Sequence, residues 1–221
     1  MKVLIACEES QTVTKAFRKL GYEAYSCDMQ ECSGGHPEWH IRGDAIKVAY
    51  TVHNEQHWDL MIAHPPCTYM SKAGARWMHA GGVVNQERLK KAYEAKYFFD
   101  KLKEAPIPFI ALENPQPLKI VGLDKPDQII QPYQFGDPFS KKTYLWTNLP
   151  HLIHTNILKE FVPFLPSNTG GAKRGQKFMY KSISQKQSSK TFEGIANAMA
   201  DQWGSYVYNY TRGITYNKVT D

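Results

Sequence analysis

Residues 2–28, KVLIACEESQTVTKAFRKLGYEAYSCD, contain the pattern that decides the fold. Lys2–Ala6 is a short apolar run rich in β-branched residues, which is typical of a buried strand. Gln11–Leu20 carries its apolar residues on one stripe, and Gly21 follows at the stop position, so a helix is predicted there. Tyr22–Cys27 predicts a second strand. A strand–helix–strand unit of about 27 residues favours a parallel sheet.

The same alternation continues along the rest of the chain. The other predicted elements are the strands Trp58–Ala63, Ile107–Leu112, Gln128–Gln134 and Thr143–Trp146 and the helices Gln86–Glu104 and Thr191–Trp203. Residues 32–43 and the glycine-containing stretch 67–84 are predicted to be loops, the second long and mobile. We therefore predict an α/β fold with a doubly wound, mostly parallel sheet covered on both faces.

The bulk composition is that of one globular domain. The chain has 221 residues, of which 42% are hydrophobic and 13% aromatic, so we predict a single domain over 1–221. The apolar run at the start is too short for a secretory signal, and no stretch approaches the ~18 apolar residues of a membrane span. We therefore expect a cytoplasmic protein (host cytoplasm if phage-encoded) with four reduced cysteines.

The positive charge is concentrated in one part of the chain. The net charge is +6, and residues 141–190 hold nine Lys or Arg against the single acid Glu160. Residues 147–190 are also irregular in pattern, which predicts a basic insertion rather than a second domain. Such a stretch suits a polyanionic partner such as nucleic acid.

Four chemically useful side chains follow predicted strands or loops: Asp28, Asp44, Cys67 and Glu113. In open α/β sheets the ligand site lies beyond the carboxyl ends of the strands, so we expect these side chains to share one edge. Two prolines precede Cys67 and stiffen the backbone that presents its thiol. Glu113 follows a buried strand, where burial often raises the pKa of a carboxyl group and lets it donate a proton.

The order of these motifs resembles the cytosine-C5 DNA methyltransferases. That family has a Pro-Cys nucleophile loop, then a helix, then a strand ending in Glu-Asn, as in Pro66-Cys67 and Glu113-Asn114 here. Its acid after the second strand and its Gly-Asp after the third match Asp28 and Gly43-Asp44. Its later basic segment aligns with 136–146, which includes Lys141. The resemblance covers about residues 1–147 and the last helix, and the overall form is similar to a short phage-type branch.

The resemblance implies a class I, Rossmann-like methyltransferase fold and a covalent mechanism. Cys67 would add to C6 of the pyrimidine, Glu113 would protonate or hydrogen-bond N3, and Lys141 would assist at O2. C5 would then take a methyl group from S-adenosylmethionine. A target base in a duplex would have to flip out, and residues 68–84 could close over it. DNA is the implied partner.

The resemblance also implies a cofactor site. Asp28 would bind the cofactor ribose, Asp44 its adenine amine, and Pro66 would line the pocket. The implied cofactor-binding set is Cys7, Glu8, Asp28, Met29, Asp44, Ala45, Pro66 and Asn197, and no metal is expected.

Three departures from the family bear on these expectations. The glycine-rich first loop is replaced by Cys7–Thr12, which has no glycine and two acids. Thr143 stands where the family has its other arginine, and Asn197 is only a neighbour of the family's asparagine position. Residues 147–190 are too few for a separate target-recognition domain, so short or absent sequence specificity is expected, with phosphate contacts dominating.

Other interpretations stay open on the sequence alone. The fold could bind nucleic acid without turnover, or the enzyme could modify a free pyrimidine nucleotide or RNA with a related cofactor. A tight zinc site is a further alternative, with candidate ligands Cys27, Cys32, His36 and His40. His53 and His57 are interpreted as surface residues.

Overall fold

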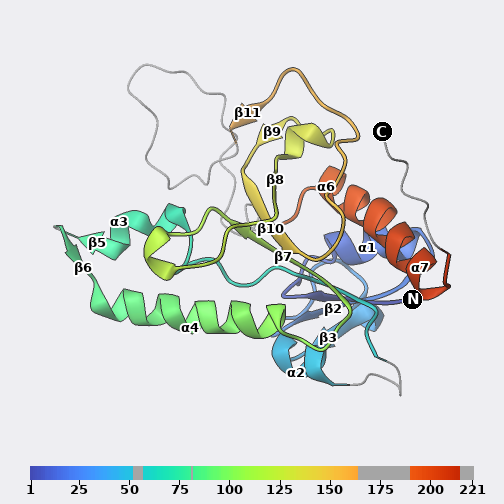
Figure 1. Ribbon diagram of the computed structural model, residues 1–221, viewed down its shortest axis with the longest axis horizontal. Helices are drawn as coiled ribbons and strands as arrows, with labels where there is room; N and C mark the ends of the chain where they lie inside the picture. Colours follow the sequence, from blue (N-terminus) through green and yellow to red (C-terminus); the bar gives the residue numbers. More distant parts are fainter. Residues whose placement is uncertain (52–56, 81, 164–189, 215–221) are drawn as a thin grey trace.

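The computed structural model describes residues 1–51, 57–80, 82–163 and 190–214, and a seven-stranded sheet lies at its centre (Figure 1). The strands of this sheet are β1 (Lys2–Ala6), β2 (Glu23–Asp28), β3 (His40–Arg42), β4 (Leu60–Ala63), β7 (Phe109–Pro115), β8 (Gln128–Ile130) and β10 (Thr143–Thr147).

Their order across the sheet is β3-β2-β1-β4-β7-β10-β8. The first five strands are parallel to one another, and β10 runs antiparallel to both β7 and β8. Counted along the chain, this is the order 3-2-1-4-5-7-6, in which the seventh strand is reversed. The predicted α/β fold with a mostly parallel sheet is confirmed.

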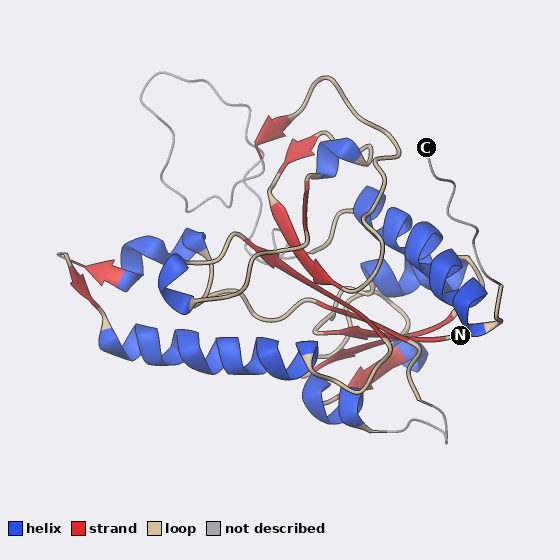
Figure 2. Cartoon of the chain, in the orientation of Figure 1, coloured by secondary structure: helices blue, strands red, loops and turns tan. Residues whose placement is uncertain are grey.

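Helices cover both faces of the sheet (Figure 2). One face is covered by α1 (Thr12–Lys19), α6 (Glu193–Ala198), a π-helical turn (Met199–Trp203) and α7 (Gly204–Thr211). The other is covered by α2 (Ala45–Tyr50) and α4 (Gln86–Lys103). Side chains of β1 alternate between the two cores, since Val3 and Ile5 pack in the first and Leu4 and Ala6 in the second. Every residue of β1 is buried, which explains its continuous apolar sequence.

Two stretches predicted to be loops contain regular structure, so those predictions were wrong in part. Within 32–43 the chain forms β3 after a 3-10 turn (Pro37–Trp39). Within 67–84 it forms a 3-10 turn (Lys72–Gly74), α3 (Ala75–Met78) and the hairpin of β5 (His79–Ala80) and β6 (Val83–Val84). Each element has four residues or fewer, too short for a periodic pattern, and β3 exists because it pairs with β2.

The remaining elements are small. A two-stranded sheet joins β9 (Phe139–Ser140) and β11 (Val162–Pro163), and 3-10 turns lie at Lys119–Val121 and Pro132–Gln134. The predicted strand Gln128–Gln134 is therefore shorter than expected. The predicted last helix begins later, at Glu193, and continues to Thr211.

None of the helices in the described part of the chain is long and apolar enough to cross a membrane.

Candidate active site

The carboxyl ends of the central parallel strands bring the predicted site residues to one edge of the sheet. Asp28 ends β2, the segment His64–Cys67 follows β4, and Glu113 lies in β7 beside the last residues of β4. Lys141 enters from the turn between β9 and β10, which is antiparallel to β7. The sheet register therefore fixes these positions before any side-chain packing is considered.

The segment that presents Cys67 is held at both ends. The backbone N–H of His64 donates to the carbonyl oxygen of Ala6 over 2.9 Å. The carbonyl of Pro65 accepts a hydrogen bond from Nδ2 of Asn114, which is fully buried. The backbone N–H groups of residues 70 and 71 both donate to the carbonyl of Cys67 and close a turn directly after it. The two prolines and these contacts give the thiol a fixed backbone position.

The thiol of Cys67 is partly exposed and is influenced by charged side chains of the site. Burial and the negative charge of Glu113 raise the pKa of Cys67, while Lys141 and a hydrogen bond from Ser71 lower it. The net pKa lies above the ordinary thiol value. Cys67 is therefore a protonated thiol in the resting site at neutral pH, and it needs a base before it can attack.

The pKa of the Glu113 carboxyl group is lowered, whereas the sequence predicted that burial would raise it. Burial raises the pKa of this carboxyl group, but a hydrogen bond and positive charge from His64 and the charge of Lys141 outweigh burial. Nδ1 of His64 lies 3.1 Å from Oε2 of Glu113. The resting site therefore contains a carboxylate, not a proton-donating acid.

His64 is the site residue that sequence reasoning missed. Its side chain is only 10% exposed, and within the described residues its Nε2 is buried without a hydrogen-bond partner. The available signal was position, since His64 directly precedes the two prolines and the cysteine. What the sequence does not show is that it reaches a carboxyl group 49 residues away.

A second group of predicted residues gathers at the ends of β1, β2 and β3. The charges of Asp28 and Asp44 act on the thiol of Cys7, whose pKa burial raises far above the ordinary value. Asp28 is partly exposed, and Met29 beside it is 69% exposed. Partly exposed carboxylates next to an apolar side chain fit the ribose hydroxyls, the amine and the sulfonium charge of S-adenosylmethionine.

The other residues of the implied cofactor set differ in exposure, and two of them, Asp44 and Glu8, accept hydrogen bonds from helices. Asp44 caps α2 by accepting hydrogen bonds from the N–H groups of residues 46 and 47 through Oδ1. Ala45 is buried in that helix, Pro66 is exposed, and Asn197 is exposed on α6. Glu8 is 4% exposed, and both of its oxygens accept hydrogen bonds from the start of α1. Glu8 therefore shapes the turn, and the hydrogen bonds on both of its oxygens are at odds with its predicted role as a direct cofactor ligand.

The glycine-free turn after β1 is covered by the protein's own loop. The side chain of Gln11 is fully buried and exchanges two hydrogen bonds with the backbone of His36. The N–H of Ser33 donates to the carbonyl of Glu9 over 2.7 Å. A Cβ added to Gly34 would lie 2.4 Å from Cβ of Gln11, so this close approach requires glycine.

The zinc alternative is not supported. Among the described residues no group of three or more His, Cys, Asp or Glu side chains could hold a metal ion. Cys27 is buried, His36 stacks on Trp39, and Nδ1 of His40 contacts Ser26. His57 is exposed, as predicted, and His53 lies outside the described residues.

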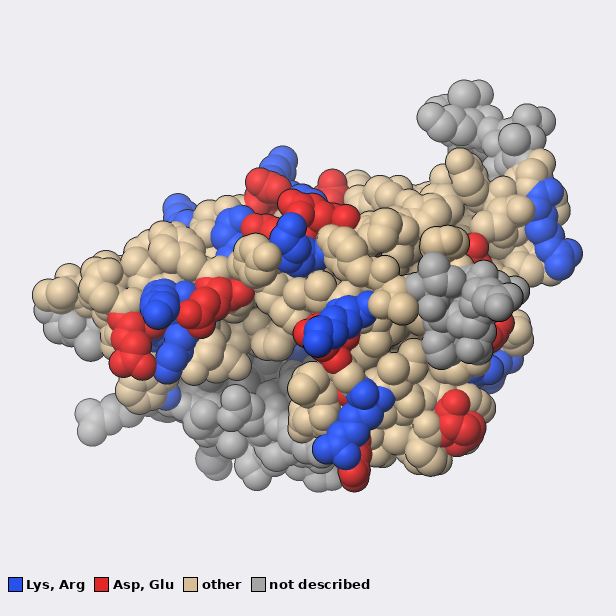
Figure 3. Space-filling model, turned by 90° about the horizontal axis from the view of Figure 1, so that it is seen from below, with Lys and Arg blue, Asp and Glu red and all other residues tan. Residues whose placement is uncertain are grey.

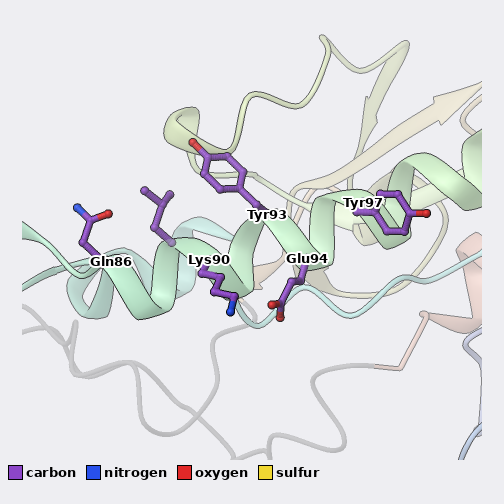
Figure 4. Close-up of a pocket in the computed structure, with 6 residues that line it drawn as sticks. Gln86, Lys90, Tyr93, Glu94 and Tyr97 are labelled. Atoms are coloured by element: carbon purple, nitrogen blue, oxygen red, sulfur yellow. The ribbon is translucent and has the colours of Figure 1, made fainter.

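A hollow of about 520 Å³ lies elsewhere, over the outer face of α4 (Figure 4). Its lining comes from that single helix and consists of Gln86, Leu89, Lys90, Tyr93, Glu94 and Tyr97. Tyr93 and Tyr97 are largely exposed. No residue of the Cys67 site contributes to it, so it is a surface feature separate from the candidate active site.

The charges around Cys67 lead to a test that needs no substrate. Because Glu113 raises the pKa of the thiol and Lys141 lowers it, the two variants should have opposite effects on alkylation. At a fixed pH near 8, we expect Glu113→Gln to speed alkylation of Cys67 by iodoacetamide and Lys141→Ala to slow it, each by about two- to fivefold. In the wild type the rate should still be rising above about pH 8.5.

Peptide mass spectrometry measures this rate at Cys67 alone, with Cys32, which is partly exposed, as an internal reference in each sample. If the two variants change the rate in the same direction, the electrostatic description of the site is wrong.

Comparison with models of known protein families gives no match, and no curated protein matches the chain. Among solved structures, a protein described as a candidate DNA modification methyltransferase encoded within an E. coli prophage is similar, with a TM-score of 0.43 and 13% identity. The match covers 66% of this chain and 46% of that one.

Two other similar structures are methyltransferases named DNMT2. A triple mutant of the Spodoptera frugiperda protein gives a TM-score of 0.39 at 15% identity, covering 75% of this chain and 55% of that chain. The S. pombe protein gives 0.39 at 14% identity, covering 73% and 52%. The chain thus spans about half the length of these three structures. All three TM-scores lie below 0.5.

Proposed function

We propose that the chain is a DNA cytosine-C5 methyltransferase that uses Cys67 as a covalent nucleophile and S-adenosylmethionine as methyl donor. The observation that carries the proposal is the position of one thiol, one carboxylate and one lysine at a single edge of the sheet, where their charges influence one another: Cys67, Glu113 and Lys141. A nucleophile, a proton carrier and a cation are what addition to a pyrimidine ring requires.

The chemistry assigned to these residues follows from their resting charges. The Cys67 thiol gives up its proton, and the sulfur pair forms a bond to C6 while the C5–C6 π pair moves into the ring. Glu113 carries a proton to N3, and Lys141 stabilises the charge that develops at O2. S-adenosylmethionine, when bound, supplies the methyl group that C5 takes up. Water then takes the C5 proton, the C6–S bond breaks with its electron pair returning to sulfur, and the proton released from N3 returns through Glu113 to restore the Cys67 thiol.

The cofactor would lie at the ends of β1, β2 and β3. Asp28 is the proposed partner of the ribose hydroxyls and Asp44 of the adenine amine, with Met29 against the adenine face. Cys7, Ala45, Pro66 and Asn197 are proposed to complete this wall. Glu8 holds the turn in shape without touching the cofactor.

A nucleic-acid substrate is supported by the arm that follows Cys67, which consists of α3 and the hairpin of β5 and β6. Trp77 is 56% exposed, and the guanidinium of Arg76 lies 4.7 Å from its ring centre. Arg88 anchors the arm by donating to the carbonyl of Thr68 over 2.8 Å. An exposed aromatic ring beside an arginine offers a surface on which bases stack and phosphates bind.

The underside of the molecule does not suit a polyanionic partner. Figure 3 shows the underside of the molecule, where basic and acidic side chains lie together rather than forming a patch of one sign. Along α4 these charges pair, as in Lys91–Glu87, Lys96–Asp100 and Lys101–Glu104. Of the basic stretch predicted to contact phosphates, Lys173, Arg174, Lys177, Lys181 and Lys186 lie outside the described residues. Contacts from that stretch therefore remain part of the proposal.

The test is methyl transfer by the purified full chain in parallel reactions. Duplex DNA, single-stranded DNA, RNA and free deoxycytidine monophosphate are each incubated with S-adenosylmethionine, and the nucleosides are analysed by mass spectrometry. We expect 5-methylcytosine in a DNA reaction and heat of cofactor binding by calorimetry. Product in the RNA or nucleotide reaction alone would replace the proposed substrate. Without product in any reaction and without cofactor binding at millimolar concentration, the chain would be a binding protein and the proposal would be wrong.

A further inference from the structure

Strand pairing and hydrogen bonds fix the backbone of both residues in the His64–Glu113 contact. His64 follows β4 without a break, and its backbone N–H is bonded to Ala6 of the neighbouring strand. Glu113 is in β7, paired with Leu145 of β10, and the next residue, Asn114, holds the carbonyl of Pro65. The 3.1 Å contact between Nδ1 and Oε2 therefore joins two fixed backbones.

The His64–Glu113 pair is largely shielded from water, and only one of the two ring nitrogens of His64 has a hydrogen-bond partner among the described residues. The side chains of His64 and Glu113 are 10% and 15% exposed. An ionised carboxylate can only accept hydrogen bonds, so Nδ1 of His64 must be the donor, which leaves Nε2 as the second polar atom of the ring. Within the described residues that atom is buried and has no partner. The ring thus uses its single good hydrogen bond on one oxygen of Glu113.

Stability is a poor explanation for this arrangement. Removing two ionisable groups from water costs free energy that their attraction often fails to return, and a buried pair can be replaced by apolar residues with little loss. A polar ring atom left without a partner adds a further cost. In contrast, a carboxyl group this buried that lacked a hydrogen-bond donor would keep its proton. What the pair provides is a carboxylate beside a thiol that still holds its proton.

We propose that His64 is a positioning residue that fixes Oε2 of Glu113, so that Glu113 accepts the Cys67 proton and then delivers it to the pyrimidine. In this step the S–H bond breaks, and its proton passes to Oε1 of Glu113, the oxygen that His64 does not contact. The sulfur pair forms the bond to C6, and the carboxyl proton moves to N3 as the π pair shifts into the ring. The ring gains one sulfur and one proton, and Glu113 returns to its resting charge. The proposal rests on the proposed function.

Among the described residues, the titratable groups that face Glu113 are His64 and Cys67 from the segment after β4 and Lys141 from the turn before β10. Losing His64 removes the strongest influence that lowers the pKa of Glu113. The carboxylate would then become protonated at a higher pH, so the acid limb of the rate profile should move upward. Lys141 remains in the variant, so part of the lowering is retained.

The experiment compares His64→Ala, His64→Asn and His64→Gln in the full chain. The amide nitrogen of Asn is as many bonds from the backbone as Nδ1, whereas that of Gln corresponds to Nε2. We expect His64→Ala to reduce kcat about 10- to 100-fold with the KM for DNA changed less than about twofold, and to move the acid limb up by about one pH unit. His64→Asn should recover most of kcat, and His64→Gln should not.

A second readout needs neither DNA nor cofactor. The pKa of Glu113 is measured by carbon NMR in the wild type and His64→Ala, with Glu113→Gln identifying the signal. A higher pKa in His64→Ala supports the proposal even if methyl transfer is absent, in which case only the proposed function has failed. If His64→Ala loses activity only in proportion to its folded fraction with an unmoved pH profile, His64 is structural and the proposal is overturned. Equal activity of His64→Asn and His64→Ala would overturn it as well.

Discussion

The Cys67→Ser variant is expected to lose methyl transfer by at least about a thousandfold while remaining folded. Serine keeps the size and hydrogen-bonding ability of the side chain, but its hydroxyl is far less acidic than a thiol and does not form an anion beside the Glu113 carboxylate. The surrounding charges already raise the pKa of the thiol, so a hydroxyl in the same place has no accessible anionic form. Substrate binding should change little, and the loss should lie in kcat.

A 5-fluorocytosine oligonucleotide gives the sharper readout, because the fluorine blocks the elimination that releases the enzyme. We expect a covalent adduct with the wild type that is absent with Cys67→Ser, scored by intact-protein mass. Cys32→Ser is the matched control, since Cys32 is also a partly exposed thiol and lies outside the site. An adduct that survives in Cys67→Ser, or is lost in Cys32→Ser, would show that the nucleophile has been misassigned.

The parts of the fold that the sequence predicts are those with long, local patterns. The helix Gln86–Lys103 matches its prediction within a residue, and the apolar run Lys2–Ala6 is a buried strand as expected. The short elements β3 and α2 were not predicted, because they depend on pairing and capping: β3 is held by β2, and α2 is capped by Asp44. Such elements are stabilised by contacts that no local window contains.

The candidate site, too, could be predicted only in part from the sequence. Its location followed from strand ends, which a sequence reveals through polar residues after apolar runs. Its charge state did not, because the pKa of Glu113 depends on His64, and nothing local indicates that the two side chains meet. Burial alone predicts a raised pKa for this carboxyl group, and the structure reverses that sign. A partner distant in sequence thus turns the expected acid into a resting base.

The turn after β1 adopts left-handed backbone conformations without any glycine. Cys7 and Gln11 have φ angles of 60° and 57°, in the left-handed region that glycine occupies at little cost. Each non-glycine residue there is strained by roughly 1 kcal/mol or more. Glu8 lies between them and binds the N–H groups of Val13 and Thr14 and the hydroxyl of Thr14. These three hydrogen bonds at the start of α1 offset the strain.

Glu8→Ala is therefore expected to lower the free energy of unfolding by about 3 kcal/mol, because it leaves three donors without an acceptor in a buried place. Glu8→Gln should cost about 1–2 kcal/mol, since its NH₂ group faces donors that need an acceptor. Urea unfolding measures both, with Glu31→Ala as the control. Glu31 is 81% exposed and pairs with an exposed arginine, so its loss should cost less than about 0.5 kcal/mol.

The free energy of unfolding also distinguishes the two roles considered for Glu8, which are binding the cofactor directly and holding the turn in shape. A residue that binds the cofactor directly would weaken S-adenosylmethionine binding in Glu8→Gln while leaving urea unfolding unchanged. A residue that holds the turn would lower stability first, and would affect the cofactor only through the altered position of Cys7. The second pattern is expected, because both oxygens of Glu8 are already occupied by α1. On this account, two acids can stand in this turn without any glycine, since one of them accepts the hydrogen bonds of the helix that follows.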